Sequence, residues 1–229
     1  MKKMTALLLA MTMALSLAGC SQKAADAPKS ADGESTSTEA PSGERKIKDE
    51  IVFAQSSDLT TMNPYIGTQE RAYSLTNHMY NTLLVYDSDM NMSCSLAESY
   101  EWLDDVTLQI KLQPNVKFHN GDPLTAEDVI FTFQKRAERG SAFKEYIDVA
   151  NMTAEDDLTV IMPFIAPHPS FIYQLTDPAF GIVPKNYFES VGEEGFAKNP
   201  IGSGPYKLKE YVTGDHYTCL LYTSDAADD

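Results

Sequence analysis

The twelve residues FHNGDPLTAEDV, at positions 118–129, specify a turn followed by the start of a helix. Asn120 and Gly121 form a strong turn signal, because both residue types tolerate a positive φ. Thr125 and Asp128 match a capping box, in which the hydroxyl and the carboxylate satisfy free N–H groups at a helix N-terminus. Apolar residues then recur at helical spacing until a glycine that favours a helix end. The predicted helix buries Val129, Ile130, Phe133 and Ala137 and stops at Gly140.

The same stretch holds residue types that bind metals, and a metal site is the alternative interpretation. His119, Asp122 and Glu127 are the candidate ligands. Their spacing matches no standard pattern of protein metal ligands. Glu127 and Asp128 also have a structural role, since each negative charge at the positive end of a helix dipole contributes roughly 0.3 to 1 kcal/mol. We therefore expect these residues to shape the backbone, with no metal and no cofactor.

Alternation of apolar and polar residues predicts two β-hairpins around this helix. Apolar and polar residues alternate through Val106, Leu108, Ile110 and Leu112, which indicates a half-buried strand. A turn at 103–105 joins this strand to the preceding one. A second hairpin is predicted within residues 148–164. Earlier in the chain, residues 51–55 predict a short buried strand and residues 69–83 an amphipathic helix. Together these patterns predict a mixed α/β fold.

The first twenty residues have the pattern of a secretory signal. Lys2 and Lys3 precede an apolar run that is too short to favour a permanent spanning helix. Leu17, Ala18, Gly19 and Cys20 resemble a bacterial lipobox, in which the cysteine receives lipid and becomes the new N-terminus. The alternative is an ordinary signal peptide with an incidental cysteine. Because each buried CH₂ contributes roughly 0.8 kcal/mol, a lipidated Cys20 is expected to hold the protein on the outer face of a cell membrane.

Residues 21–50 are expected to form a disordered tether. The segment has no aromatic residue and a single branched apolar one, Ile47, so it cannot bury enough apolar surface to offset its ordering entropy. Residues 51 onward are long enough for one domain with a hydrophobic core.

The charge of the chain argues against a nucleic-acid partner. There are 33 acidic and 18 basic residues, a formal net charge of −15. The first fifty residues hold equal numbers of each, so the whole excess lies in the remainder. Solubility of a secreted protein explains this acidity more simply than an electrostatic trap for cationic ligands.

Four segments resemble the family 5 extracellular solute-binding proteins, the dipeptide-, oligopeptide- and nickel-binding components of ABC importers. VKFHNGDPLTAEDVIFTF (116–133) resembles the family signature, and SLAESYEWLDDVTLQIKLQPNV (95–116) resembles the stretch before it. FAKNPIGSGPYKLKEY (196–211) resembles the family's later glycine-proline-tyrosine motif. DLTTMNPYIGT (58–68) resembles the family's first strand-to-helix loop. The resemblance runs from residue 51 to 218 in the family's order. One departure is Cys94, where the family commonly has a proline.

The resemblance implies a periplasmic-binding-protein type II-like fold, of which residues 51–218 supply most of the first lobe. It implies a monomeric binding protein and no enzyme, with peptides or related small solutes as ligands and an ABC permease and ATPase complex as partner. Family members contact the ligand backbone in the loop that follows the first strand. The implied ligand-binding residues are Met62, Asn63, Tyr65, Thr68, Asn77 and Tyr80. For the loop, the alternative is a turn around Asn63 and Pro64 with Tyr65 packed inward.

The likeness to the family ends near Thr218. Residues 219–229, CLLYTSDAADD, resemble translated sequencing-adapter read-through, and we expect them to be non-native. The family would continue into a second lobe that carries the carboxylate for a peptide's amino terminus, and no position here matches it.

Two other functions are weighed against solute import. A lipid-anchored hydrolase, with or without a metal ion, needs a clustered set of catalytic or ligand residues, but the four histidines are widely spaced, at His78, His119, His168 and His216. Residues 202–206, GSGPY, do not match the G-x-S-x-G motif of a nucleophilic serine and predict a tight turn into a strand. A surface receptor that senses a solute without importing it is the third possibility.

Overall fold

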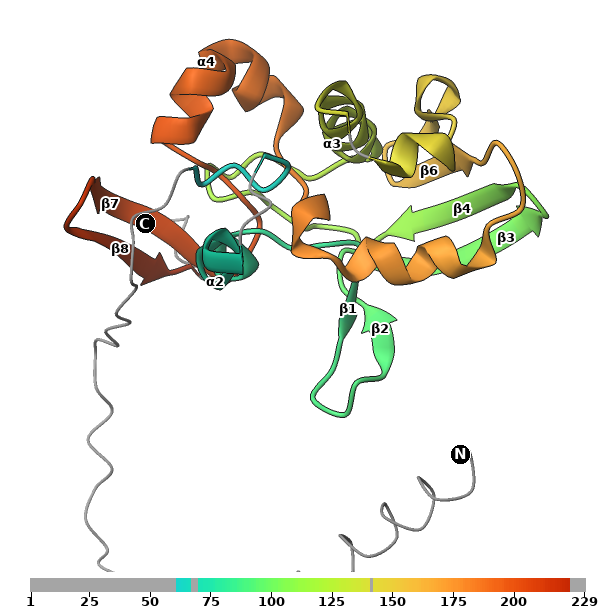
Figure 1. Ribbon diagram of the computed structural model, residues 1–229, viewed down its shortest axis with the longest axis horizontal. Coiled ribbons are helices and arrows are strands. Elements are labelled where there is room, and N and C mark those ends of the chain that lie inside the picture. Colours follow the sequence, from blue (N-terminus) through green and yellow to red (C-terminus); the bar gives the residue numbers. More distant parts are fainter. Residues whose placement is uncertain (1–60, 67–69, 141, 223–229) are drawn as a thin grey trace, which may run out of the picture. The chain divides into compact units, whose positions relative to one another are not determined.

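The computed structural model describes residues 61–66, 70–140 and 142–222, which all belong to one compact unit, Val52–Asp229. The predicted strand at 51–55, Thr68 and the predicted signal, lipidation and tether segments lie outside these residues. The helices and strands are α2 (Glu70–Met79), β1 (Leu84–Tyr86), β2 (Met92–Cys94), β3 (Ala97–Asp104), β4 (Thr107–Leu112), α3 (Ala126–Glu138), β5 (Thr153–Asp156), β6 (Thr159–Pro163), α4 (Lys185–Lys198), β7 (Tyr206–Val212) and β8 (His216–Leu221) (Figure 1). Short 3₁₀ helices are η1 (Ala142–Glu145), η2 (Val149–Asn151), η3 (Pro169–Thr176) and η4 (Pro178–Phe180).

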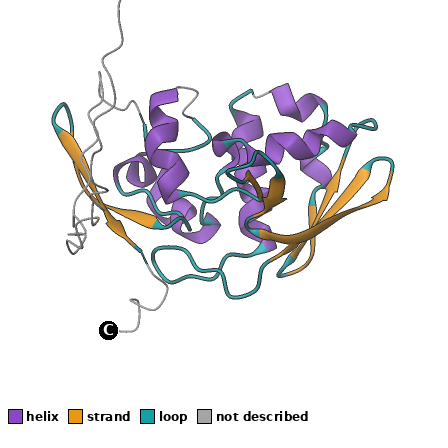
Figure 2. Cartoon of the chain, turned by 90° about the horizontal axis from the view of Figure 1, so that it is seen from below, coloured by secondary structure: helices purple, strands orange, loops and turns teal. Residues whose placement is uncertain are grey.

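The largest sheet among the described residues is antiparallel, with strand order β3-β4-β6-β5. It contains both predicted hairpins, so the period-two interpretation of the sequence is confirmed. Leu108 pairs with Met162 and Ile110 with Val160, and all four side chains are buried. The other strands form two separate hairpins, β1–β2 and β7–β8. Helices lie between the four-stranded sheet and the β7–β8 hairpin (Figure 2).

Helix α3 lies between two hydrophobic clusters. Val129, Ile130 and Phe133 belong to the cluster that covers the sheet, whereas Phe131 belongs to a second cluster with residues of α2 and α4. Adjacent positions on a helix point to different faces, so one helix can serve both cores. The predicted stripe is therefore confirmed at Val129, Ile130 and Phe133, while Ala137 is partly buried against the same cluster.

The predicted ends of α3 are confirmed as well. A capping box is present, and the Asp128 carboxylate accepts the backbone N–H of Thr125 at 2.8 Å and its hydroxyl at 2.9 Å. At the other end Gly140 has φ +79°, in the left-handed region that glycine enters without a steric penalty. Its N–H donates to the Ala137 carbonyl.

Helix α2 ends at Met79, four residues before the predicted end. The residues beyond it bond to distant parts of the chain. The Met79 carbonyl accepts the N–H of Gly204, and the Asn81 carbonyl accepts the N–H of Ile182. Asn81 also donates its side-chain amide to the Ser203 carbonyl. These long-range bonds replace further helical turns.

The predicted turn at 202–206 leads into β7 and packs directly on the end of α2. An added Cβ at Gly202 would lie 2.0 Å from the Met79 carbonyl oxygen, and one at Gly204 would lie 2.5 Å from that of His78. Only glycine allows the two backbone segments to approach this closely. Among the described residues, none of the helices has the length and apolar character needed to cross a membrane.

Candidate functional site

The loop at 61–66 folds inward. Its turn is closed by the Ile66 N–H, which donates to the Asn63 carbonyl at 3.3 Å, and by the Asn63 N–H, which donates to the Thr61 hydroxyl at 3.1 Å. Met62, Asn63 and Tyr65 are almost fully buried, with at most 4% of each residue exposed. The inward-packed turn considered above therefore describes this loop.

The other proposed ligand residues lie in different environments. Tyr80 follows α2 and is buried, whereas Asn77 lies on α2 and is exposed to solvent. Thr68 lies outside the described residues. The structure brings Met62, Tyr65 and Tyr80 together in the second hydrophobic cluster and leaves Asn77 apart from it.

Three buried side chains of this region have unsatisfied polar atoms. Within the part of the chain that the structure describes, the amide of Asn63 and the hydroxyls of Tyr65 and Tyr80 make no hydrogen bond of good geometry, although the Asn63 side chain lies close enough to Tyr65 to oppose the rise of its pKa. Burial raises the pKa of Tyr65 to about 12 and raises that of Tyr80 well above its ordinary value. Both phenols therefore stay protonated at neutral pH. An unsatisfied buried polar group costs about 1 to 3 kcal/mol, so these atoms are candidate donors and acceptors for a ligand or an ordered water.

Aromatic rings connect this loop to a surface groove. The ring of Phe188 lies 6.0 Å from Tyr65 and 5.3 Å from Phe131, measured between centroids. Phe131 and Phe188 line the groove, whereas Tyr65 lies behind them. The buried loop thus supports the apolar floor of the groove.

We call this surface the α3–α4 groove. Its volume is about 440 Å³, and it is lined by Phe131, Gln134, Lys135 and Glu138 of α3 and by Lys185, Phe188, Glu189 and Gly192 of α4. Gly192 has φ +69°, and α4 kinks there. A second groove, of about 510 Å³, lies between the end of α4 and β7.

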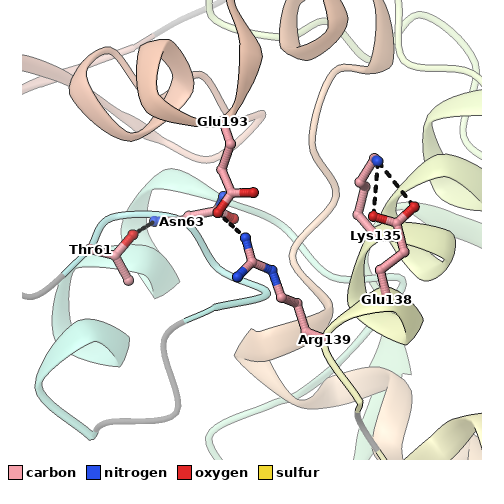
Figure 3. A network of polar contacts seen from close by, with 6 residues as sticks. All are labelled: Thr61, Asn63, Lys135, Glu138, Arg139 and Glu193. Atoms are coloured by element: carbon pink, nitrogen blue, oxygen red, sulfur yellow. Dashed lines mark hydrogen bonds and ion pairs between the residues drawn. The ribbon is translucent and has the colours of Figure 1, made fainter.

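Charged pairs surround the aromatic floor. Lys135 pairs with Glu138 at 3.0 Å, and Arg139 pairs with Glu193 across the two helices (Figure 3). The Lys135 ammonium also lies 5.6 Å from the centre of the Phe131 ring, within the range of a cation–π contact. The site therefore offers aromatic surface together with both signs of charge. Such a surface suits a solute with apolar and charged groups.

The groove lacks a nucleophile paired with a histidine base. Its eight lining residues include no histidine, serine or cysteine, so they hold no nucleophile paired with a histidine base. Among the described residues, no group of three or more His, Cys, Asp or Glu side chains is arranged to hold a metal ion.

His119 has a role that the sequence did not reveal. Its Nε2 lies 2.8 Å from the Gly204 carbonyl, and its Nδ1 accepts the Gly202 N–H at 3.3 Å. Both ring nitrogens are thus engaged by backbone atoms, and the carboxylate of Glu127 pairs with Lys185. These contacts argue against the metal site considered at His119, Asp122 and Glu127. The partners of His119 lie more than eighty positions away, so no local pattern could identify them.

The chain has a mixed α/β scaffold with a groove between α3 and α4, and comparison with known proteins shows its class. Residues 91–220 match the model of bacterial extracellular solute-binding proteins, family 5 Middle. The chain therefore belongs to the family 5 bacterial extracellular solute-binding proteins. This is a family of solute-binding proteins and not of enzymes.

Individual relatives support the same family. The chain is 27% identical to the oligopeptide-binding protein AppA of Bacillus subtilis over 219 residues, which cover 90% of this chain and 38% of AppA. It is 31% identical to the glutathione-binding protein GsiB of Escherichia coli over 171 residues, covering 72% of this chain and 33% of GsiB. The chain thus spans about a third of the length of these curated relatives.

Solved structures have the same fold. The structure of AppA from Bacillus subtilis in complex with a nonapeptide aligns with a TM-score of 0.65 and 28% identity, covering 73% of this chain and 35% of AppA. The substrate-binding domain of an oligopeptide ABC transporter from Bacillus anthracis aligns with a TM-score of 0.69 at 18% identity, covering 75% of this chain and 37% of that chain. The mixed α/β fold class, as part of a periplasmic binding protein, is confirmed.

Proposed function

We propose that this chain is part of the substrate-binding lipoprotein of a bacterial ABC importer, which captures peptides or related small solutes outside the membrane and delivers them to a permease. The observation that carries the proposal is the family match over residues 91–220. The names of two relatives, an oligopeptide-binding and a glutathione-binding protein, support peptides as the solute class. A further similar structure, MoaA from Agrobacterium tumefaciens with mannopinic acid, supports keeping other small solutes in the class.

In this proposal residues 51–218 supply most of one lobe of a two-lobed protein. The share of its relatives that the chain covers, about a third, supports this assignment. Residues 1–20 are the signal, Cys20 carries the lipid and residues 21–50 form the tether. Residues 219–229 are proposed to be non-native, although the family match reaches residue 220 and β8 continues to Leu221. Recovery of the gene from its genome tests that last assignment, because a stop codon directly after the same tail would refute it.

The proposed solute site on this lobe is the α3–α4 groove and the loop beneath it. Four of the proposed ligand residues are buried, namely Met62, Asn63, Tyr65 and Tyr80. We assign them to the support of the groove floor. We also assign polar contacts with the solute to the polar members of this set, made when the solute displaces the loop. Asn77 and Thr68 do not line the groove, and they remain proposed contacts of the bound solute. Closure of a second lobe over this surface would exclude water from the bound solute.

Ligand screening of the mature protein encoded by the full gene tests the function. Peptides of two to nine residues, glutathione and sugar acids are the probes, and thermal unfolding is the measurement. A solute present at 100 times its dissociation constant adds ~2.7 kcal/mol to the free energy of unfolding. A protein that binds none of these solute classes contradicts the proposal. Permease and ATPase genes beside the gene support import, and their absence supports a sensing receptor.

A further inference from the structure

The carboxylate of Asp128 binds the starts of two helices. Its Oδ2 accepts the N–H of Thr125, at the beginning of α3, at 2.8 Å. Its Oδ1 accepts the N–H of Lys185, the first residue of α4, also at 2.8 Å. Asp128 is 6% exposed, and burial raises the pKa of its carboxyl while the bonds from Lys185 and Thr125 oppose that rise. The capping box inferred from the sequence accounts for only one of these two attachments.

Two further contacts join the same parts of the chain. The Thr132 hydroxyl donates to the Asp128 carbonyl at 2.8 Å and accepts the N–H of Val183 at 3.1 Å. The Lys185 ammonium pairs with Glu127 at 2.8 Å, but both side chains are partly or largely exposed, and exposed pairs contribute little. The bond from the Lys185 N–H is buried and charge-assisted, so it contributes more than the exposed ion pair does.

These attachments lie at the base of the α3–α4 groove. Phe131 is one helical turn beyond Asp128 on α3, and Phe188 is one turn beyond Lys185 on α4. Both rings line the groove, and their centroids lie 5.3 Å apart. Because a helix turn is stiff, a displacement of Lys185 relative to Asp128 moves the Phe188 wall relative to the Phe131 wall.

We infer that Asp128 is a positioning residue, whose carboxylate sets the separation of α3 and α4 and thereby the width of the groove that binds solute. The effect on solute binding rests on the function proposed above, whereas the effect on helix separation does not.

The two N–H groups that face the side chain at position 128 require an aspartate there. Asparagine has the same shape but offers one oxygen, so its NH₂ group would face either the Thr125 N–H or the Lys185 N–H, both of which are donors. Glutamate adds a CH₂ group to a buried site where extra volume is destabilising. An aspartate satisfies both helix starts without a shift of either.

Distance measurements between two spin labels test the inference without any solute. The labels are placed at the exposed residues Gln134 on α3 and Asn186 on α4, in the mature chain with Cys20, Cys94 and Cys219 changed to serine. We expect Asp128→Ala and, to a smaller extent, Asp128→Asn to lengthen and broaden the distance distribution. Thr125→Ala is the matched control, because it removes the hydroxyl but keeps both N–H bonds to Asp128. We expect its distribution to match that of the parent.

Solute affinity of the full protein gives the second readout, at a temperature where every variant is folded. We expect Asp128→Asn to weaken binding by about tenfold, because a displaced Phe188 wall would cost the bound solute contacts worth about 1.4 kcal/mol, and Thr125→Ala to leave it unchanged. If the labels in both Asp128 variants report the parent's distances, or if Thr125→Ala shifts them as much, the inference is wrong. A parent protein that binds no solute refutes the proposed function instead and leaves the distance test standing.

Discussion

The Nδ1 atom of His119 accepts the backbone N–H of Gly202 at 3.3 Å, and this bond joins two turns that are far apart in the sequence. The other ring nitrogen, Nε2, faces the Gly204 carbonyl, which can only accept a hydrogen bond. His119 is therefore neutral, with its proton on Nε2. The same turn contacts the end of α2 through Gly202 and Gly204, so His119 links the predicted signature motif to the second hydrophobic cluster.

We expect the burial of neutral His119 to make the protein less stable in acid. Burial lowers the pKa of His119, the bond to Gly204 opposes the shift, and Lys207 adds to it. The unfolded chain, with a histidine pKa of about 6.5, therefore binds more protons than the folded chain below that pH. The stabilisation is complete above about pH 6.5 and is lost as the pH falls towards the lowered pKa of the folded state, by at most about 1.4 kcal/mol per pH unit.

Urea unfolding of the parent and of His119→Gln, at pH 7.5 and pH 5.5, measures this effect. Glutamine keeps a donor and an acceptor but does not titrate, and all other titrating groups are common to both proteins. We expect the parent to lose more free energy of unfolding than His119→Gln over this range. An equal loss in the two proteins contradicts the prediction.

The structural features that the sequence predicted correctly are those that depend on neighbouring residues. The Thr125–Asp128 capping box, the Gly140 helix end and the alternating strand through Leu108 and Ile110 all follow from residues within a few positions of each other. These elements were confirmed because their geometry is set locally, by backbone N–H groups and by the periodicity of side chains.

Prediction from the sequence failed where the local structure depends on contacts with residues far away in the chain. The early end of α2 depends on Gly204 and Ile182, more than one hundred positions away from it. The second attachment of Asp128 depends on Lys185, and the inward packing of Tyr65 depends on Phe188. No local pattern distinguishes a tyrosine that faces a ligand from one that faces a core. The groove itself exists only where α3 and α4 meet.

Gly202→Ala is expected to destabilise the protein by about 3 kcal/mol, because an added Cβ would lie 2.0 Å from the Met79 carbonyl oxygen and force the two segments apart. Gly214→Ala is the matched control. Gly214 has φ +78° but nothing within 4 Å of an added Cβ, so only backbone strain of roughly 1 kcal/mol is expected. Chemical denaturation of both variants measures the difference, and equal losses would show that the contact with α2 is not tight.

Tyr65→Phe is expected to leave the free energy of unfolding nearly unchanged, within about 0.5 kcal/mol. The Tyr65 hydroxyl is buried and makes no hydrogen bond of good geometry among the described residues; its contact with Asn63 is weak, so its removal costs little and keeps the ring contact with Phe188. Phe188→Ala, in contrast, is expected to cost about 3 to 5 kcal/mol, since it removes a buried ring from the groove floor. Thermal and urea unfolding measure both changes.

The same Tyr65→Phe variant also tests the proposed solute contact. If the hydroxyl donates to bound solute, calorimetry of the full protein will show weaker binding by Tyr65→Phe at unchanged stability. If stability falls by more than about 1 kcal/mol, the hydroxyl has a protein partner instead and Tyr65 is a structural residue.

Cys20→Ser is expected to move the protein from the membrane fraction to the soluble fraction of a bacterial host. Residues 17–20 resemble a lipobox, and acyl chains contribute roughly 0.8 kcal/mol per buried CH₂, so two or three chains are enough to anchor a protein to a membrane. Fractionation with radiolabelled palmitate is the measurement. Cys94→Ser is the control, because Cys94 is an exposed free thiol that should carry no lipid. Label that persists in Cys20→Ser, or a parent protein without label, would contradict lipidation of Cys20.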